Sequence, residues 1–226
     1  MDKPSTLKAL SAFPLVLAIM GAPIFLSAWS FDYWQAWVFL VVFSASTTLH
    51  ALILLRYAPD VLMRRMKAGP TAETRPVQRL IMTCVTASFF LFLIVCGLDH
   101  RFGWSHVPLV AVIFGDFLIA LSFYVFTKVC LENQFASATI ELHEGQNVVS
   151  TGMYGIVRHP MYAGALLLLL GIPLSLGSLW SGLLILLATG ILVWRISDEE
   201  KLLLSNLKGY TEYCSKVRYR LIPGLY

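Results

Sequence analysis

Residues 80–98 read LIMTCVTASFFLFLIVCGL and contain no charged side chain. This segment approaches the roughly 20 apolar residues that a helix needs to cross a bilayer. The rest of the chain has a similar character, with 58% hydrophobic and 13% charged residues among 226. A soluble domain typically has about 45–50% apolar and about 25% charged residues. The composition therefore excludes an ordinary soluble domain and predicts one membrane domain.

Apolar stretches recur along the chain. There are six, at Phe13–Trp29, Tyr33–Leu55, Leu80–Leu98, Val107–Val129, Tyr162–Leu176 and Leu179–Trp194. Backbone amides in hydrocarbon must be paired within their own segment, so these stretches are expected to be helices. The last two are short, and Gly177-Ser178 between them is typical of a tight helical hairpin. We predict an all-α polytopic membrane protein of about six transmembrane helices that ends in a hairpin and a cytosolic C-terminal region.

The distribution of lysine and arginine predicts the orientation, because these residues concentrate in cytoplasmic loops. The connection between the second and third stretches carries six of them: Arg56, Arg64, Arg65, Lys67, Arg75 and Arg79. If this loop and, after six passes, both termini are cytosolic, Arg101 is the one exception among 17 lysines and arginines. The positive charge is then expected to face membrane lipids, and no nucleic-acid partner is predicted.

Two features of the apolar part carry little functional signal. No pair of the four cysteines has C-x-x-C spacing, so neither a disulfide framework nor a metal site is predicted. Asp116 lies near the middle of the fourth stretch. A carboxylate at that depth either serves a function or forms a hydrogen bond that locks helix packing, and both readings stay open.

The polar residues cluster around the last two stretches. Pro160 is suited to the first position of a helix, which places His159 at or near the N-cap, where backbone N–H groups favour an anion. Arg195 and Glu199 are four residues apart and share one helix face, whereas Glu200 lies about 100° further round. A cation beside a carboxylate suits a zwitterionic ligand, and it is equally compatible with side chains that anchor the helix at the interface.

These segments contain a recognisable set of motifs. The run Gly152-Met153-Tyr154 … Arg158-His159-Pro160-Met161-Tyr162-x-Gly164 is followed by Arg195-x-x-x-Glu199-Glu200 and Gly209-Tyr210-x-x-Tyr213. In this order and spacing they resemble the isoprenylcysteine carboxyl methyltransferase family and the wider group with the phospholipid N-methyltransferases. The resemblance covers residues 128–226. It implies that this region, with its hairpin and tail, binds S-adenosylmethionine (SAM), and that residues 1–127 form the helices through which a lipophilic substrate enters.

The resemblance also implies roles for individual residues. The cofactor-binding residues are expected to be Thr139, Gln146, Asn147, Val148, Val149, Tyr154, His159, Pro160, Met161, Tyr162, Glu199 and Glu200. Glu199 and Arg195 are expected to be catalytic, with Arg195 placed beside a substrate carboxylate that it would hold in bidentate fashion. An amine substrate would instead need a proton acceptor, for which Glu199 and Glu200 are candidates.

The predicted function is methyl transfer from SAM to a lipophilic or membrane-embedded substrate, with carboxyl O-methylation of an isoprenylcysteine-like acid as the first choice. Phospholipid N-methylation and S-methylation of a small thiol are alternatives within this class. An NADPH-dependent sterol-type reductase and a non-enzymatic membrane protein are alternatives from other classes. Nothing in the sequence indicates the oligomeric state.

Overall fold

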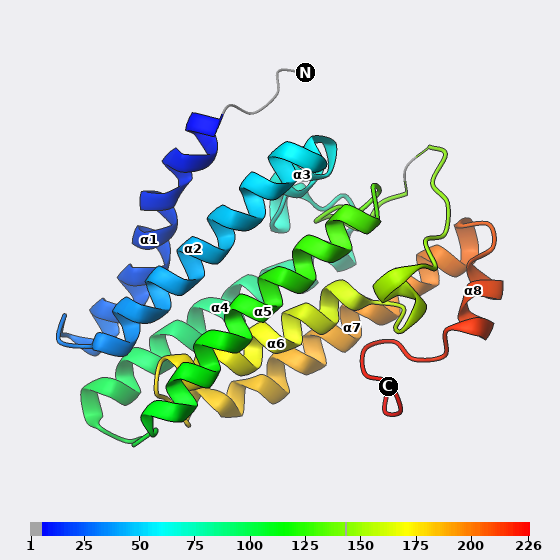
Figure 1. The fold of residues 1–226 in the computed structure, drawn as a ribbon. Coiled ribbons are helices and arrows are strands. Elements are labelled where there is room, and N and C mark those ends of the chain that lie inside the picture. Colours follow the sequence, from blue (N-terminus) through cyan, green and yellow to red (C-terminus); the bar gives the residue numbers. More distant parts are fainter. Residues whose placement is uncertain (1–5, 143) are drawn as a thin grey trace.

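The computed structural model describes residues 6–142 and 144–226 and consists of helices and connecting segments (Figure 1). Its α-helices are α1 (Thr6–Ala28), α2 (Trp34–Tyr57), α3 (Pro59–Met66), α4 (Pro76–Phe102), α5 (Leu109–Glu132), α6 (Pro160–Ser175), α7 (Leu184–Asn206) and α8 (Tyr210–Lys216). Short 3₁₀ turns occur at η1 (Pro70–Ala72), η2 (Gly152–Gly155) and η3 (Ser181–Leu183). The all-α prediction is confirmed for the described residues.

Each predicted apolar stretch lies in a helix, but the helices differ in length. Four segments are long and apolar enough to cross a membrane: α2, α4, α5 and Ser181–Asn206, which joins η3 to α7. Two apolar helical segments, Val16–Ala28 and Pro160–Ser175, are shorter. The structure therefore supports four membrane-spanning helices, and the count of six stays a prediction.

The hairpin at the end of the bundle is formed by α6 and α7, which run side by side in Figure 1. Its second arm is longer than the apolar stretch 179–194 predicted, because α7 continues to Asn206. Arg195 and Glu199 therefore project from a continuous helix. As expected, Pro160 is the first residue of α6 and His159 is its N-cap.

The contact between α5 and α6 brings the two backbones unusually close. A Cβ atom at Gly115 would lie 2.3 Å from the backbone nitrogen of Ser175, and one at Gly171 would lie 2.9 Å from the carbonyl oxygen of Gly115. Small residues allow such close approach between membrane helices. Ser175 also donates a hydrogen bond to Asp116. Of the two roles considered for this carboxylate, function or helix packing, the hydrogen bond corresponds to helix packing.

The two ends of the bundle differ in composition. Exposed aromatic residues gather around the turns between α1 and α2, α4 and α5, and α6 and α7: Trp29, Phe31, Trp34, Trp37, Phe102, Trp104 and Trp180. Such belts mark a membrane–water interface. The opposite end carries α3, the connector between α5 and α6, α8 and the C-terminal tail (Figure 1). The predicted cytosolic position of the N-terminus falls on residues 1–5, which lie outside the described residues.

Candidate active site

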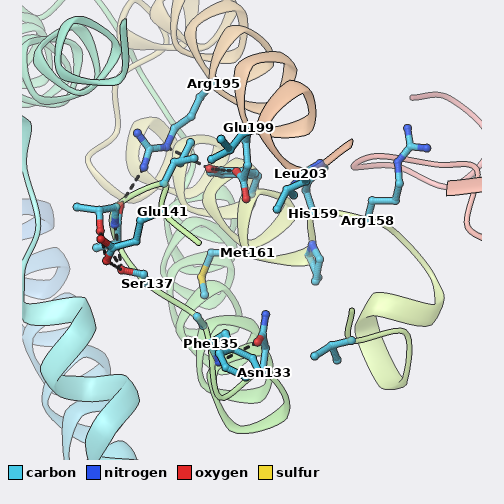
Figure 2. Close-up of a pocket in the computed structure, with 18 of the residues that line it drawn as sticks. Asn133, Phe135, Ser137, Glu141, Arg158, His159, Met161, Arg195, Glu199 and Leu203 are labelled. Atoms are coloured by element: carbon cyan, nitrogen blue, oxygen red, sulfur yellow. Dashed lines mark hydrogen bonds between the residues drawn. The ribbon is translucent and has the colours of Figure 1, made fainter. Parts of the chain in front are cut away.

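A cavity of about 420 Å³ lies where the connector between α5 and α6 meets α6, α7 and α8. This volume is within the range of about 300–1,000 Å³ typical of ligand sites. The predicted site residues that line it are Thr139, Gln146, Asn147, Val148, Val149, Tyr154, His159, Pro160, Met161, Tyr162, Arg195 and Glu199. Figure 2 shows side chains converging on this space from α7, from the start of α6 and from the connector. Residues far apart in the sequence are thus gathered around one cavity.

The lining of the cavity contains both polar and apolar side chains. Five of the apolar ones come from four helices of the bundle: Met82 and Val85 of α4, Phe126 of α5, Ala165 of α6 and Leu192 of α7. All five lie within the apolar helices of the bundle. The cavity can therefore hold a polar group and an apolar chain at the same time.

Tyr162 connects the two residues that were predicted to share a face of α7. Its hydroxyl donates a hydrogen bond to Glu199 Oε2 at 2.6 Å and accepts one from Arg195 Nε at 3.1 Å. The prediction of a common face is confirmed. Among the described residues, the bond from Tyr162 is the one hydrogen bond that Glu199 accepts, so its second oxygen is available to a ligand.

The guanidinium group of Arg195 is buried and already has several partners. Its Nη1 donates to Gln78 Oε1 at 2.9 Å, and its Nη2 donates to Glu73 Oε1 at 3.0 Å and to the carbonyl oxygen of Ala138 at 2.9 Å. Together with the bond to Tyr162, these interactions hold the side chain between α4, α6 and the connector. Its predicted contact with a substrate carboxylate stays a prediction.

Glu200 is not among the residues that line the cavity, and it forms an ion cluster with Arg158, His159 and Arg220. Its Oε1 lies 2.9 Å from Arg158 Nε and 3.2 Å from His159 Nε2, and its Oε2 accepts a hydrogen bond from Arg220 Nε at 2.7 Å. The backbone N–H groups of Arg158 and His159 also donate to the carbonyl oxygens of Tyr219 and Arg220. Glu200 therefore ties α7, the start of α6 and the C-terminal tail together, and it does not line the cavity.

Tyr154 is held by its neighbours on both its hydroxyl and its backbone. Asn133 Nδ2 donates to the Tyr154 hydroxyl at 3.0 Å, and the Tyr213 hydroxyl donates to the Tyr154 carbonyl at 2.7 Å. Burial raises the pKa of Tyr154 well above its ordinary value, and the hydrogen bond from Asn133 offsets part of this shift. The hydroxyl is therefore neutral at physiological pH and presents an uncharged aromatic side chain to the cavity.

A carboxylate fixes the turn that carries Tyr154. Glu132, the last residue of α5, accepts hydrogen bonds from the Thr151 hydroxyl and from the Met153 backbone, both at 3.1 Å. Gly152 has φ +50°, and a Cβ atom there would lie 1.9 Å from Glu132 Oε1. Only glycine fits both requirements without a shift of the turn or of Glu132.

Sequence reasoning did not identify four residues that build this site: Glu73, Gln78, Glu132 and Asn133. Glu73 and Gln78 are more than a hundred residues from Arg195 in the chain. One local signal was available, since Glu73 is an isolated carboxylate in a connection rich in arginine. The other three have no comparable signal in the sequence.

Part of the sequence matches the model of a known protein family. Residues 110–209 match the family model described as phospholipid methyltransferase. The match confirms the predicted resemblance of this part of the chain to the membrane methyltransferases. It begins in α5, includes α6 and α7, and ends at the start of α8.

A second comparison finds a reductase. The chain is 36% identical over 91 residues to the delta(14)-sterol reductase of Mus musculus. The matched region covers 39% of this chain and 22% of that protein. The chain therefore spans about a fifth of the length of the reductase, whose activity cannot be transferred to it as a whole.

Proposed function

We propose that the protein is an integral membrane methyltransferase that transfers a methyl group from SAM to a lipophilic or membrane-embedded substrate. The observation that carries this proposal is the cavity, around which the expected cofactor residues gather together with apolar side chains of the bundle. The match of residues 110–209 to the phospholipid methyltransferase family supports the same reaction class.

The residues around the cavity fit the chemical groups of SAM. The available oxygen of Glu199 can accept hydrogen bonds from its ribose or amino group, and the side chains of Tyr154 and Tyr210 offer aromatic faces. When bound, SAM supplies an electrophilic methyl group on a positively charged sulfur. Burial also raises the pKa of Tyr210, so both tyrosines stay neutral and suit the stacking of a flat or cationic group.

The side chains contribute mainly by positioning and by excluding water. Arg195, Tyr162 and Glu199 form a chain of hydrogen bonds that fixes the orientation of the Glu199 carboxylate. The apolar side chains of the lining would hold the substrate so that its reactive end meets this carboxylate. Alignment and desolvation of this kind can supply most of the acceleration of a displacement reaction.

Three methyl acceptors are compatible with this class and make different demands on the site. A carboxylate, as in an isoprenylcysteine-like acid, is ionised at neutral pH and would need the cation Arg195. The amine of a phospholipid would need a proton acceptor, and Glu199 is better placed than Glu200, which is engaged by Arg158, His159 and Arg220. A thiol would need activation as a thiolate.

The mouse reductase provides the observation for a second candidate function, reduction of a sterol-like substrate by NADPH. A dinucleotide needs cationic partners for its phosphates. Two of the arginines near the cofactor end, Arg158 and Arg220, are already paired with Glu200. SAM carries no phosphate and makes no such demand, so these paired arginines fit it better than they fit a dinucleotide.

The basic loop and the aromatic belt together favour a cytosolic position for the cavity and for the C-terminal tail.

The test of the proposed function is incubation of the purified protein with methyl-labelled SAM and a membrane lipid extract, with NADPH and the same extract in parallel. We expect label in the lipid fraction and no oxidation of NADPH. Oxidation of NADPH without label would replace the proposal by the reductase.

A further inference from the structure

The guanidinium group of Arg195 has little capacity left for a ligand. A guanidinium carries five N–H donors. Four hydrogen bonds, to Tyr162, Gln78, Glu73 and Ala138, occupy four of them. The remaining donor is on Nη1. A carboxylate that binds an arginine in bidentate fashion needs two parallel donors, so Arg195 could hold one only by releasing a present partner.

Glu73 is the partner that matters most, because it is the one that carries charge. Its side chain is buried, with 2% of the residue exposed, and Oε1 lies 3.0 Å from Arg195 Nη2. Its second oxygen accepts a hydrogen bond from the backbone N–H of Ile140 at 3.3 Å. The carboxylate is therefore fixed on both sides, between α7 and the connector that lines the cavity.

Neighbouring residues keep this pair in place. Gln78, which is fully buried, accepts from Arg195 and donates to Asp198 Oδ2 at 2.5 Å. Asp198 in turn lies 2.7 Å from Arg75 Nη1. The first turn of α4 and α7 are thus connected by alternating charges and an amide, and a release of Glu73 would disturb both helices.

The pair also sets the charge presented to the cavity. The positive charge of Arg195 is neutralised by Glu73 at contact distance, whereas Glu199 keeps one oxygen without a protein partner among the described residues. At this position the site offers a neutral ion pair beside an available carboxylate. Such a surface repels a substrate carboxylate and tolerates a neutral or cationic group.

We propose that Glu73 is a specificity-determining residue that occupies Arg195 and thereby excludes lipophilic substrates whose reactive end is a carboxylate. The inference rests on the proposed function and narrows its methyl acceptors to uncharged or cationic ones, such as an amine or a thiol. It departs from the role that the family resemblance implied for Arg195. Glu73 acts through Arg195 and is a positioning residue.

The test measures binding of a carboxylate directly, so that it does not depend on methyl transfer. The probes are oleate and oleyl alcohol, which share a chain and differ in the charged end. Affinity for each is measured by displacement of a fluorescent lipid from the purified protein in detergent. We expect the parent protein to bind oleate no more tightly than the alcohol. Glu73→Gln keeps the shape and removes the charge, and it should bind oleate about tenfold more tightly than the parent, with no change for the alcohol.

Controls separate this effect from loss of fold and from net charge. Glu73→Asp retains the counter-ion and should behave like the parent. Glu212→Gln removes an exposed carboxylate on α8 and should not increase oleate affinity. A gain in Glu212→Gln equal to that in Glu73→Gln would overturn the proposal, as would no gain in a folded Glu73→Gln.

The parent protein provides a second test if Glu73→Gln does not fold. A preference of the parent for oleate over the alcohol that disappears in Arg195→Gln would show that Arg195 already accepts a carboxylate, and it would overturn the proposal. Equal affinity for the two probes supports it. SAM binding to the same samples is measured separately, so failure of the proposed function is distinguishable from failure of this inference.

Discussion

Each end of the bundle contains a buried carboxylate, Asp99 on α4 at the aromatic end and Glu200 on α7 at the cavity end, and the two have different partners. At the aromatic end, Asp99 accepts hydrogen bonds from the hydroxyls of Ser105 and Ser178 at 2.7 and 2.6 Å. This joins the turn after α4 to the turn after α6. At the cavity end, Glu200 is bound by cations and Glu199 keeps an oxygen available. Asp99 and Glu200 thus link separate segments of the fold, whereas Glu199, which lines the cavity with a single hydroxyl partner among the described residues, leaves a position for a ligand.

The largest effect should come from removing the charge of Glu200. In Glu200→Gln, the cations of Arg158 and Arg220 lose a buried partner, which should destabilise the protein by about 3 kcal/mol. A loss of this size corresponds to a fall of about 10 °C in melting temperature for a domain of this size. The measurement is thermal unfolding in detergent, with the exposed Glu212→Gln as a control that should leave the melting temperature within about 1 °C. An unchanged melting temperature in Glu200→Gln would contradict a structural role for the ion cluster.

Asp99→Asn tests the other half of the comparison. Loss of the charge weakens two hydrogen bonds at a residue that is 1% exposed, which should cost about 2 kcal/mol. The affinity for SAM should stay the same, because Asp99 lies at the opposite end of the bundle from the cavity. Thermal unfolding and SAM binding on the same preparation check both parts. A fall in SAM affinity together with stability would show that the two ends are coupled.

Gly152→Ala should affect the ligand site more than the fold. The new methyl group would collide with Glu132 and move the turn that carries Tyr154, so we expect SAM affinity to fall by about fivefold. Gly103→Ala is a matched control, because Gly103 also has a positive φ (+63°), lies at the aromatic end and has no atom within 4 Å of an added Cβ. It should lose about 1 kcal/mol of stability and no SAM affinity. An equal loss of SAM affinity in both variants would show that backbone strain in general lowers the affinity, and not the collision with Glu132.

The smallest perturbation tests the sidedness of the two ends. His106 and Lys208 are exposed at the aromatic end and near the cavity end, and cysteine at either position should leave stability nearly unchanged. In a background without other reactive cysteines, we expect a membrane-impermeant maleimide to label His106→Cys on intact cells and Lys208→Cys only after permeabilisation. The reverse pattern would overturn the proposed cytosolic position of the cavity.

Helix positions and local spacing were predictable because they depend on short-range rules. The start of α6 at Pro160 and the shared face of Arg195 and Glu199 followed from residue preferences and helix periodicity. Glu200 was expected among the cofactor-binding residues from the family resemblance, but it does not line the cavity and is bound by Arg158, His159 and Arg220. The pattern of apolar residues did not predict that α7 continues through its polar residues to Asn206.

The partners of Arg195 were not predictable, because they depend on how distant segments pack. Gln78 on α4 and Glu73 shortly before it reach this residue because α4 packs against α7. Asn133 and Glu132 become site residues when the connector folds back onto the end of α5. A periodic pattern specifies the face of one helix, and it contains no information on which faces meet.

The most direct test of the account is equilibrium binding of SAM to the purified protein, measured for the parent, Glu199→Gln and Asp99→Asn. We expect saturable binding by the parent, a loss of at least about tenfold in Glu199→Gln and parental affinity in Asp99→Asn. Folded parent protein that does not bind SAM, or a Glu199→Gln variant that binds it like the parent, would contradict the assignment of this cavity as a cofactor site.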